Sequence, residues 1–178
     1  MPNYVIHIAV AEEYLKNHKD RKENHHDFIE GVIFPDTVID KSKTHYGRVS
    51  SESNLYKFLE VNTLQDSFKR GHFLHILTDY LFYNKYIDTI SKEIYDDYAL
   101  LNKGLIEKYK IVLPEKANKY VGFKEGSNPK IISNEIVDKL ISDVSELDID
   151  KIAKEVKEKD PKWLEFRPLK YIGDMKWR

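Results

Sequence analysis

The sequence predicts an all-α protein with a single helical domain, on the strength of three observations. Apolar residues recur at helical spacing along most of the 178-residue chain. Two stretches, 110–113 and 170–172, have strand-like composition, but neither is long enough to build a sheet. The length also fits one domain of about 100–200 residues. We therefore expect a helical, metal-binding domain over residues 1–160 and a C-terminal tail, 161–178, packed on the same domain.

Composition narrows the range of functions. With 41% apolar and 33% charged residues the chain has a globular composition, and its net charge of −1 gives no electrostatic reason for an obligatory nucleic-acid partner. Cysteine is absent, so any metal must be held by histidine, carboxylate, backbone or water. No stretch approaches the ~20 apolar residues of a transmembrane helix. The N-terminal residues lack the pattern of a signal peptide, so we expect a cytoplasmic protein without a transmembrane segment.

The first helix is expected over residues 3–16, where apolar residues form a stripe with His7 beside it. The charged stretch 16–27, which ends in His25-His26-Asp27, indicates a solvated loop.

Residues 28–53 are expected to form an irregular loop. Pro35 biases Phe34 away from the helical conformation, so the apolar run before it should end there. Asp36 follows the proline, where by itself it would suggest a turn or a helix N-cap, and His45 lies in a polar stretch that would by default be exposed.

The chain beyond residue 53 is predicted to be helical with interruptions. A short helix is expected over 54–61, and Thr63 is a candidate N-cap for the next one. The helical pattern from 64 to 110 is too long for one globular helix, so we expect a break near 83–88 or 102–104.

Two further helices are expected before the tail, one capped by Ser133 and one by Asp148 or Asp150. Trp163 and Trp177 are expected to hold the tail on the domain.

The candidate functional residues begin with His75 and Asp79. They are four residues apart in an apolar segment, so on a helix they share one buried face. A buried imidazole and a buried carboxylate are costly without a partner, and a metal ion would supply one. A hydrogen-bonded core pair without metal is the alternative interpretation.

Three other polar residues lie in apolar or turn contexts: His7, Asp36 and His45. His7 by itself is as consistent with a satisfied histidine at a helix contact as with a metal ligand. Together with His75 and Asp79 they offer three imidazoles and two carboxylates, a ligand set that suits zinc or a similar divalent transition metal.

The order of these residues resembles the bacterial zinc-dependent phospholipase C family, which shares its fold with the S1/P1 nucleases. The matching motifs are an early histidine, a Gly-x-x-x-Pro-Asp turn, a Thr-His loop and a Gly-x-x-x-His-x-x-x-Asp helix. In this chain they read His7, Phe28-Ile-Glu-Gly-Val-Ile-Phe-Pro-Asp36, Lys43-Thr-His-Tyr46 and Gly71-His-Phe-Leu-His-Ile-Leu-Thr-Asp79, and they fall within residues 1–85.

The resemblance implies a helical domain around a zinc cluster and hydrolysis of phosphate esters, with a small phosphate ester or a lipid headgroup as substrate. By residue matching, Asp36, His45, His75 and Asp79 would hold one zinc, and His7 would belong to a second that Asp79 bridges. A zinc-activated water would attack phosphorus, with Asp36 the carboxylate closest to it, as ligand or base.

The chain departs from the family pattern downstream, because no histidine follows His75. The further zinc site of the family is therefore absent or rebuilt from carboxylates, for which the candidates are Asp88, Glu93, Asp96 and Asp97. One or two ions are expected rather than three.

Two other functions remain open. A metal-binding protein of the same fold that has lost catalysis would also lack the downstream histidines. An HD-type phosphohydrolase is suggested by the adjacent pair His26-Asp27, although the surrounding stretch is too charged for a buried helix.

Overall fold

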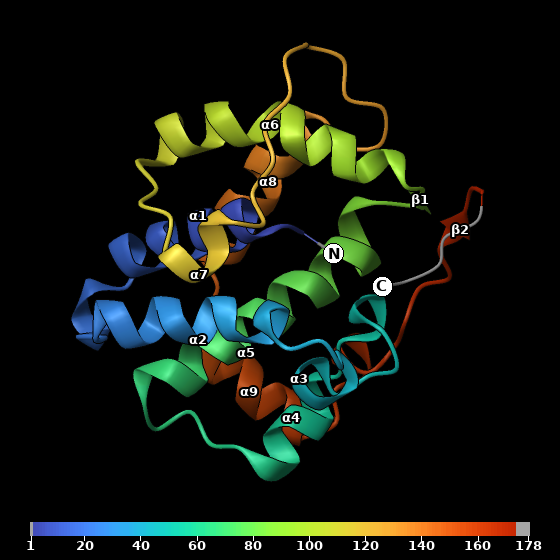
Figure 1. Ribbon diagram of the computed structural model, residues 1–178. Coiled ribbons are helices and arrows are strands. Elements are labelled where there is room, and N and C mark those ends of the chain that lie inside the picture. Colours follow the sequence, from blue (N-terminus) through green and yellow to red (C-terminus); the bar gives the residue numbers. More distant parts are fainter. Residues whose placement is uncertain (1, 174–178) are drawn as a thin grey trace.

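Two helices whose backbones touch form the centre of the fold, α2 (His25–Thr37) and α5 (Ser67–Leu81) (Figure 1). The computed structural model describes residues 2–173. A Cβ atom added at Gly31 would lie 2.0 Å from the carbonyl oxygen of Phe68, and one at Gly71 would lie 2.1 Å from that of Phe28. No residue with a side chain allows this approach, so the two glycines set the distance between the helices.

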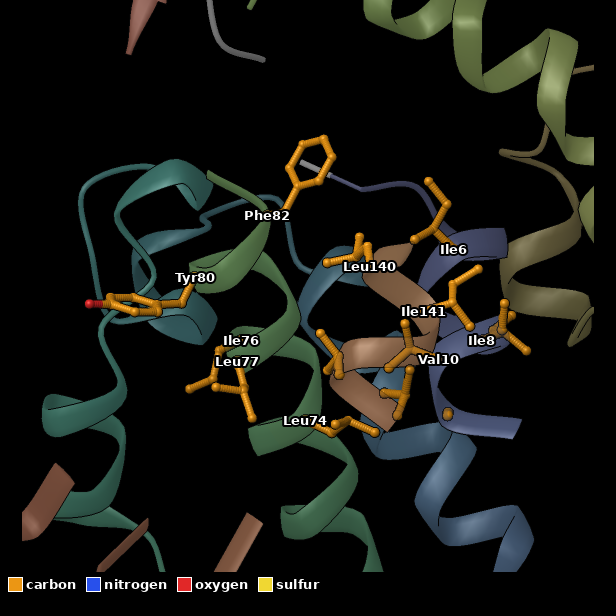
Figure 2. Close-up of a cluster of buried hydrophobic side chains, with 14 of the residues drawn as sticks. Ile6, Ile8, Val10, Leu74, Ile76, Leu77, Tyr80, Phe82, Leu140 and Ile141 are labelled. Atoms are coloured by element: carbon orange, nitrogen blue, oxygen red, sulfur yellow. The ribbon is translucent and has the colours of Figure 1, made fainter. Parts of the chain in front are cut away.

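Helix α1 (Tyr4–Asn17) packs against α2 and α5, and α6 (Glu93–Tyr109) and α8 (Asn134–Ser145) cover its other sides. Helices α4 (Leu55–Val61) and α9 (Ile149–Lys157) pack on each other and on the far side of α5. Figure 2 shows part of the apolar core between these elements, with side chains from α1, α5 and α8 and the turn after α5: Ile6, Ile8, Val10, Leu74, Ile76, Leu77, Tyr80, Phe82, Leu140 and Ile141. The prediction of an all-α protein is confirmed.

The central helix α5 begins at Ser67, capped by Asp66, whose side chain accepts a hydrogen bond from the backbone N–H of Lys69. The prediction of Thr63 as its N-cap is therefore wrong by three residues. Two of the predicted caps, Ser133 for α8 and Asp148 for α9, are confirmed. Polar side chains that accept a backbone N–H in this way fix where each helix starts.

The solvated loop predicted at 16–27 is confirmed for residues 18–24, although helices reach into both of its ends, whereas the irregular loop predicted at 28–53 is wrong over its first ten residues, which belong to α2. Helix α1 ends at Asn17, a short 3-10 turn follows at Lys19–Arg21, and α2 runs from His25 through Pro35 to Thr37. Proline is tolerated because it lies in the last turn of α2, where it removes a single backbone hydrogen bond. Packing along α5 outweighs the local bias of Phe34 against helix.

The rest of the segment holds two short turns, the helical turn α3 (Ser42–His45) and a 3-10 turn at Ser50–Glu52. They place His45 and the following serines against the C-terminal half of α5.

The break predicted near 83–88 is confirmed. A π-helical turn, Phe82–Tyr86, follows α5 directly, and the short strand β1 (Thr89–Ile90) separates it from α6, which is continuous through Gly104.

A four-residue helix, α7 (Glu115–Asn118), lies beside α2. The C-terminal segment begins with a 3-10 turn, Pro161–Trp163, and its strand β2 (Lys170–Tyr171) pairs in parallel with β1. The Trp163 ring is buried and donates to Glu155, as expected for a side chain that holds the tail; Trp177 lies outside the described residues. None of the described helices is both long and apolar enough to cross a membrane.

Candidate metal centre

Five side chains from four elements meet where α2 ends beside α5. His7 comes from α1, Asp36 from the last turn of α2, His45 from α3, and His75 and Asp79 from α5. These are the five residues that the sequence predicts as metal ligands. All five side chains are buried, with relative exposures of 0–2%.

Asp79 lies at the centre and directs its two oxygens to different imidazoles. Oδ1 is 3.3 Å from Nε2 of His7, whereas Oδ2 is 3.0 Å from Nε2 of His45 and 3.5 Å from Nε2 of His75. The hydroxyl of Ser53 lies 3.3 Å from the same Oδ2. One carboxylate therefore faces two separate positions where a cation can be held.

Asp36 lies next to the imidazoles of His45 and His75. Its Oδ1 is 3.8 Å from Nε2 of His45 and 4.0 Å from Nε2 of His75, and these two nitrogens are 3.2 Å apart. Ligand atoms of His7, His75 and Asp79 all lie within 4.8 Å of one another, as do those of Asp36, His45 and His75. Each group is compact enough to hold a metal ion.

The orientation of the His75 ring is fixed by a hydrogen bond from Nδ1 to the carbonyl oxygen of Val32, at 2.7 Å. A carbonyl only accepts, so Nδ1 carries a proton, and in the neutral ring Nε2 turns its lone pair into the cluster. This bond crosses from α5 to α2, and the contact at Gly31 and Gly71 brings the two helices close enough to form it.

Buried polar atoms in the cluster lack hydrogen-bond partners among the described residues. These atoms are both ring nitrogens of His7 and Oδ1 of Asp79. The approach of Nε2 to Oδ1 is close but is not aligned as a hydrogen bond. Buried polar groups are nearly always satisfied, so a group of unsatisfied atoms around two compact ligand sets fits a bound cation.

The electrostatics of the cluster also favour positive charge at its centre. Burial opposes the charged form of His75, but the charges of Asp36 and Asp79 outweigh it and raise the pKa of this imidazole. Burial by itself would raise the pKa of Asp79, but the surrounding histidines, His75 first, hold it well below its ordinary value. The pKa of His7, by contrast, is lowered to about 4 by burial and by the neighbouring His75.

Lys41 is a member of the site that sequence reasoning missed. Its Nζ is 3.2 Å from Oδ1 of Asp36 and also contacts the backbone oxygens of Asp36 (2.9 Å) and Pro35 (3.3 Å) at the end of α2. It thus balances one carboxylate and satisfies free helix carbonyls. Its only signal in the sequence is a lysine five residues after a candidate ligand, which lysine-rich sequences show often by chance.

The histidine–aspartate pair of the HD-type interpretation lies outside the cluster, and another buried histidine near it has its own partner. His26 and Asp27 have side-chain exposures of 82% and 58%, so the structure does not bring the pair on which the HD-type interpretation depends to the cluster. His72 is buried one turn before His75, but its Nε2 donates to the carbonyl oxygen of Thr44 at 2.8 Å.

The downstream carboxylates that were candidates for a rebuilt third site have other partners. Asp88 pairs with Arg167, Glu93 with Lys130, and Asp96 with Lys124. Asp97 accepts the backbone N–H groups of residues 130–132. In the part of the chain that the structure describes, ligand atoms therefore gather around Asp79 and not around these residues.

Comparisons with known proteins add no relative: no family model matches the chain, and no curated protein or solved structure matches it. A functional site is therefore indicated by the buried histidine–aspartate cluster itself, whose residues fit a divalent cation.

Proposed function

We propose that the protein is a zinc-dependent hydrolase of phosphate esters. The proposal depends most on Asp79, because its two carboxylate oxygens face different imidazoles. A carboxylate in this arrangement can bridge two ions, one near His7 and one among Asp36, His45 and His75. Zinc is favoured over magnesium or calcium because three of the five side chains are imidazoles.

Counting donor atoms connects the number of ions to the function. With Asp79 bridging, the five side chains offer six donor atoms, whereas two tetrahedral ions require eight. Two positions would then be left for water and substrate. With a single ion, Asp36, His45, His75 and Asp79 would fill four positions, as in a closed structural site.

Zinc, when bound, would supply an ionisable water near neutral pH and would neutralise charge on the phosphoryl oxygens. The chain's own residues would hold this chemistry in place. The motif resemblance places Asp36 closest to the water, as a ligand of the neighbouring ion or as general base. Lys41 keeps a positive charge next to Asp36, and the burial of the ligands strengthens every charge interaction in the site. The choice of phosphate esters as substrates follows from the motif resemblance.

A metal-binding protein without catalysis is the second candidate, and a specific observation favours it. All five ligand side chains are almost completely shielded from solvent, which is typical of closed structural sites. A shared proton in place of a metal ion is the remaining occupant that the geometry allows, because a buried imidazolium can also pair with Asp79.

Metal stoichiometry and turnover together separate these possibilities. The full chain, purified without chelator and reloaded with zinc, should hold two ions and hydrolyse an activated phosphodiester such as bis(4-nitrophenyl) phosphate. His7→Gln should keep one ion and lose turnover, whereas His25→Gln, at a histidine with 64% side-chain exposure, should change neither. One bound ion without turnover would identify a structural metal site. If no metal binds, a proton shared between the histidines and Asp79 would be the remaining interpretation of the cluster.

A further inference from the structure

The hydroxyl of Thr44 lies between two ligand-bearing segments. Its Oγ1 is 3.1 Å from the carbonyl oxygen of Pro35, 3.4 Å from that of Lys41, and 3.1 Å from Nδ1 of His45. Thr44 is buried, so these contacts are not exchanged with water.

The two carbonyl oxygens beside this hydroxyl favour one arrangement of protons. A threonine hydroxyl has a single proton, and the carbonyl oxygens of Pro35 and Lys41 can only accept it. Once it is donated there, Oγ1 can only accept from His45, so Nδ1 of His45 carries a proton. In the neutral ring, Nε2, which faces Asp79 at 3.0 Å, then has the lone pair that a cation between the two residues would accept.

Thr44 also ties the short helix α3 to its neighbours. Through Pro35 it is linked to the residue before Asp36, and its own carbonyl oxygen accepts the Nε2–H of His72 on α5. That histidine is a neutral donor, because burial lowers its pKa to about 3. One residue therefore connects the elements that carry Asp36, His45 and His75.

We propose that Thr44 is a positioning residue of the metal centre, which holds His45 in the Nδ1–H tautomer so that Nε2 can bind the ion. The inference rests on the metal-binding part of the proposed function. Without the hydroxyl, a buried Nδ1–H would have no acceptor, and the ring would gain by moving its proton to Nε2, where Asp79 accepts it. The ligand nitrogen would then be blocked.

The first test reads the tautomer directly and requires no metal. Long-range ¹H–¹⁵N correlation spectra of the metal-free full chain, recorded over a pH series so that the neutral ring is sampled, report which nitrogen of His45 is protonated. Loss of its signals in His45→Asn supplies the assignment. We expect Nδ1–H in the wild type and in Thr44→Ser, which keeps the hydroxyl, and Nε2–H in Thr44→Val, which keeps the shape.

The second test measures zinc affinity of the same variants by competition with a chelating dye. Thr44→Val should bind zinc about 10–100-fold more weakly, the usual effect of removing a residue that orients a ligand, and Thr44→Ser should recover most of this loss. Thr37→Val is the matched control, because the Thr37 hydroxyl also bonds a backbone carbonyl near the end of α2 but touches no ligand.

The outcomes distinguish this inference from the proposed function. Nε2–H at His45 in the wild type overturns the inference, even if Thr44→Val does not fold. An unchanged tautomer in folded Thr44→Val, or an equal loss of affinity in Thr37→Val, also overturns it. If the expected tautomers are found but no variant binds zinc, Thr44 does fix the tautomer of the His45 ring, and the proposed metal centre is overturned.

Discussion

Replacing Gly71 by alanine should destabilise the protein, although alanine is the better helix former. The position lies inside α5, where the change from glycine to alanine is worth about 1 kcal/mol in favour of the helix. The new Cβ would, however, stand 2.1 Å from the carbonyl oxygen of Phe28, and contacts under 3.0 Å essentially never occur. The obstacle is backbone of α2, which cannot rotate away as a side chain would.

The magnitude follows from the distance that the helices must move. To reach 3.0 Å from 2.1 Å, α5 and α2 must separate locally by about 0.9 Å. Overpacking of this kind costs about 1–3 kcal/mol, and occasionally more. A similar displacement at the 2.7 Å bond from His75 to Val32 would take it beyond hydrogen-bond reach, so the orientation of a candidate ligand would be lost as well.

Gly104→Ala is the matched control. It is also inside a helix, α6, but nothing lies within 4 Å of its added Cβ. This variant should gain about 0.5–1 kcal/mol. Urea unfolding followed by circular dichroism would measure both variants, and zinc affinity would be measured alongside.

We expect Gly71→Ala to unfold at lower urea concentration than the wild type and to bind zinc more weakly, while Gly104→Ala unfolds later and binds zinc normally. Equal stabilisation by both substitutions would refute the argument that backbone contact between α2 and α5 sets the geometry of the site.

Three further predictions test separate parts of the structure. Zinc at 100 times its dissociation constant should stabilise the fold by about 2.7 kcal/mol and raise Tm, with reversal by chelator; a Tm insensitive to zinc and chelator would count against a native metal site. Asp97→Ala should lower the free energy of unfolding in urea by about 2–3 kcal/mol, because this buried carboxylate accepts three backbone N–H groups of residues 130–132. Asp96 is its exposed neighbour, and Asp96→Ala should change stability by less than about 1 kcal/mol. Burial lowers the pKa of His72 from 6.5 to about 3, so the neutral ring contributes its full share to the free energy of unfolding above pH 6.5. This contribution, about 5 kcal/mol in all, is lost as the pH falls toward 3. The urea midpoint of His72→Gln should therefore fall less over this pH range than that of the wild type, and parallel curves would contradict the assignment.

Local pattern was sufficient for much of the fold. Helical spacing predicts α1, α4, α5, α8 and α9, and a polar residue before an apolar run predicts the caps of the last two. The error at α2 has a physical cause. The bias against helix before Pro35 is a property of two neighbouring residues, whereas α2 is stabilised through Pro35 by contacts along the whole length of α5.

The candidate site divides in the same way. His75 and Asp79 could be paired from sequence because four residues on a helix fix a common face, and the motif order added His7, Asp36 and His45. Lys41 and the hydroxyl of Thr44 gave no such signal, because their roles depend on where the end of α2 lies relative to α3.

The sequence by itself determined the helical class, the positions of most helices and the identity of five polar residues that belong together. Only the tertiary structure decided that the two oxygens of Asp79 face different histidines, that Lys41 pairs with Asp36, and which nitrogen of His75 bonds the backbone and which faces the cluster. The reason is that periodicity and capping act within a few residues of the chain. The features of the site depend instead on distances of a few ångströms between remote segments, which the contact at Gly31 and Gly71 brings together.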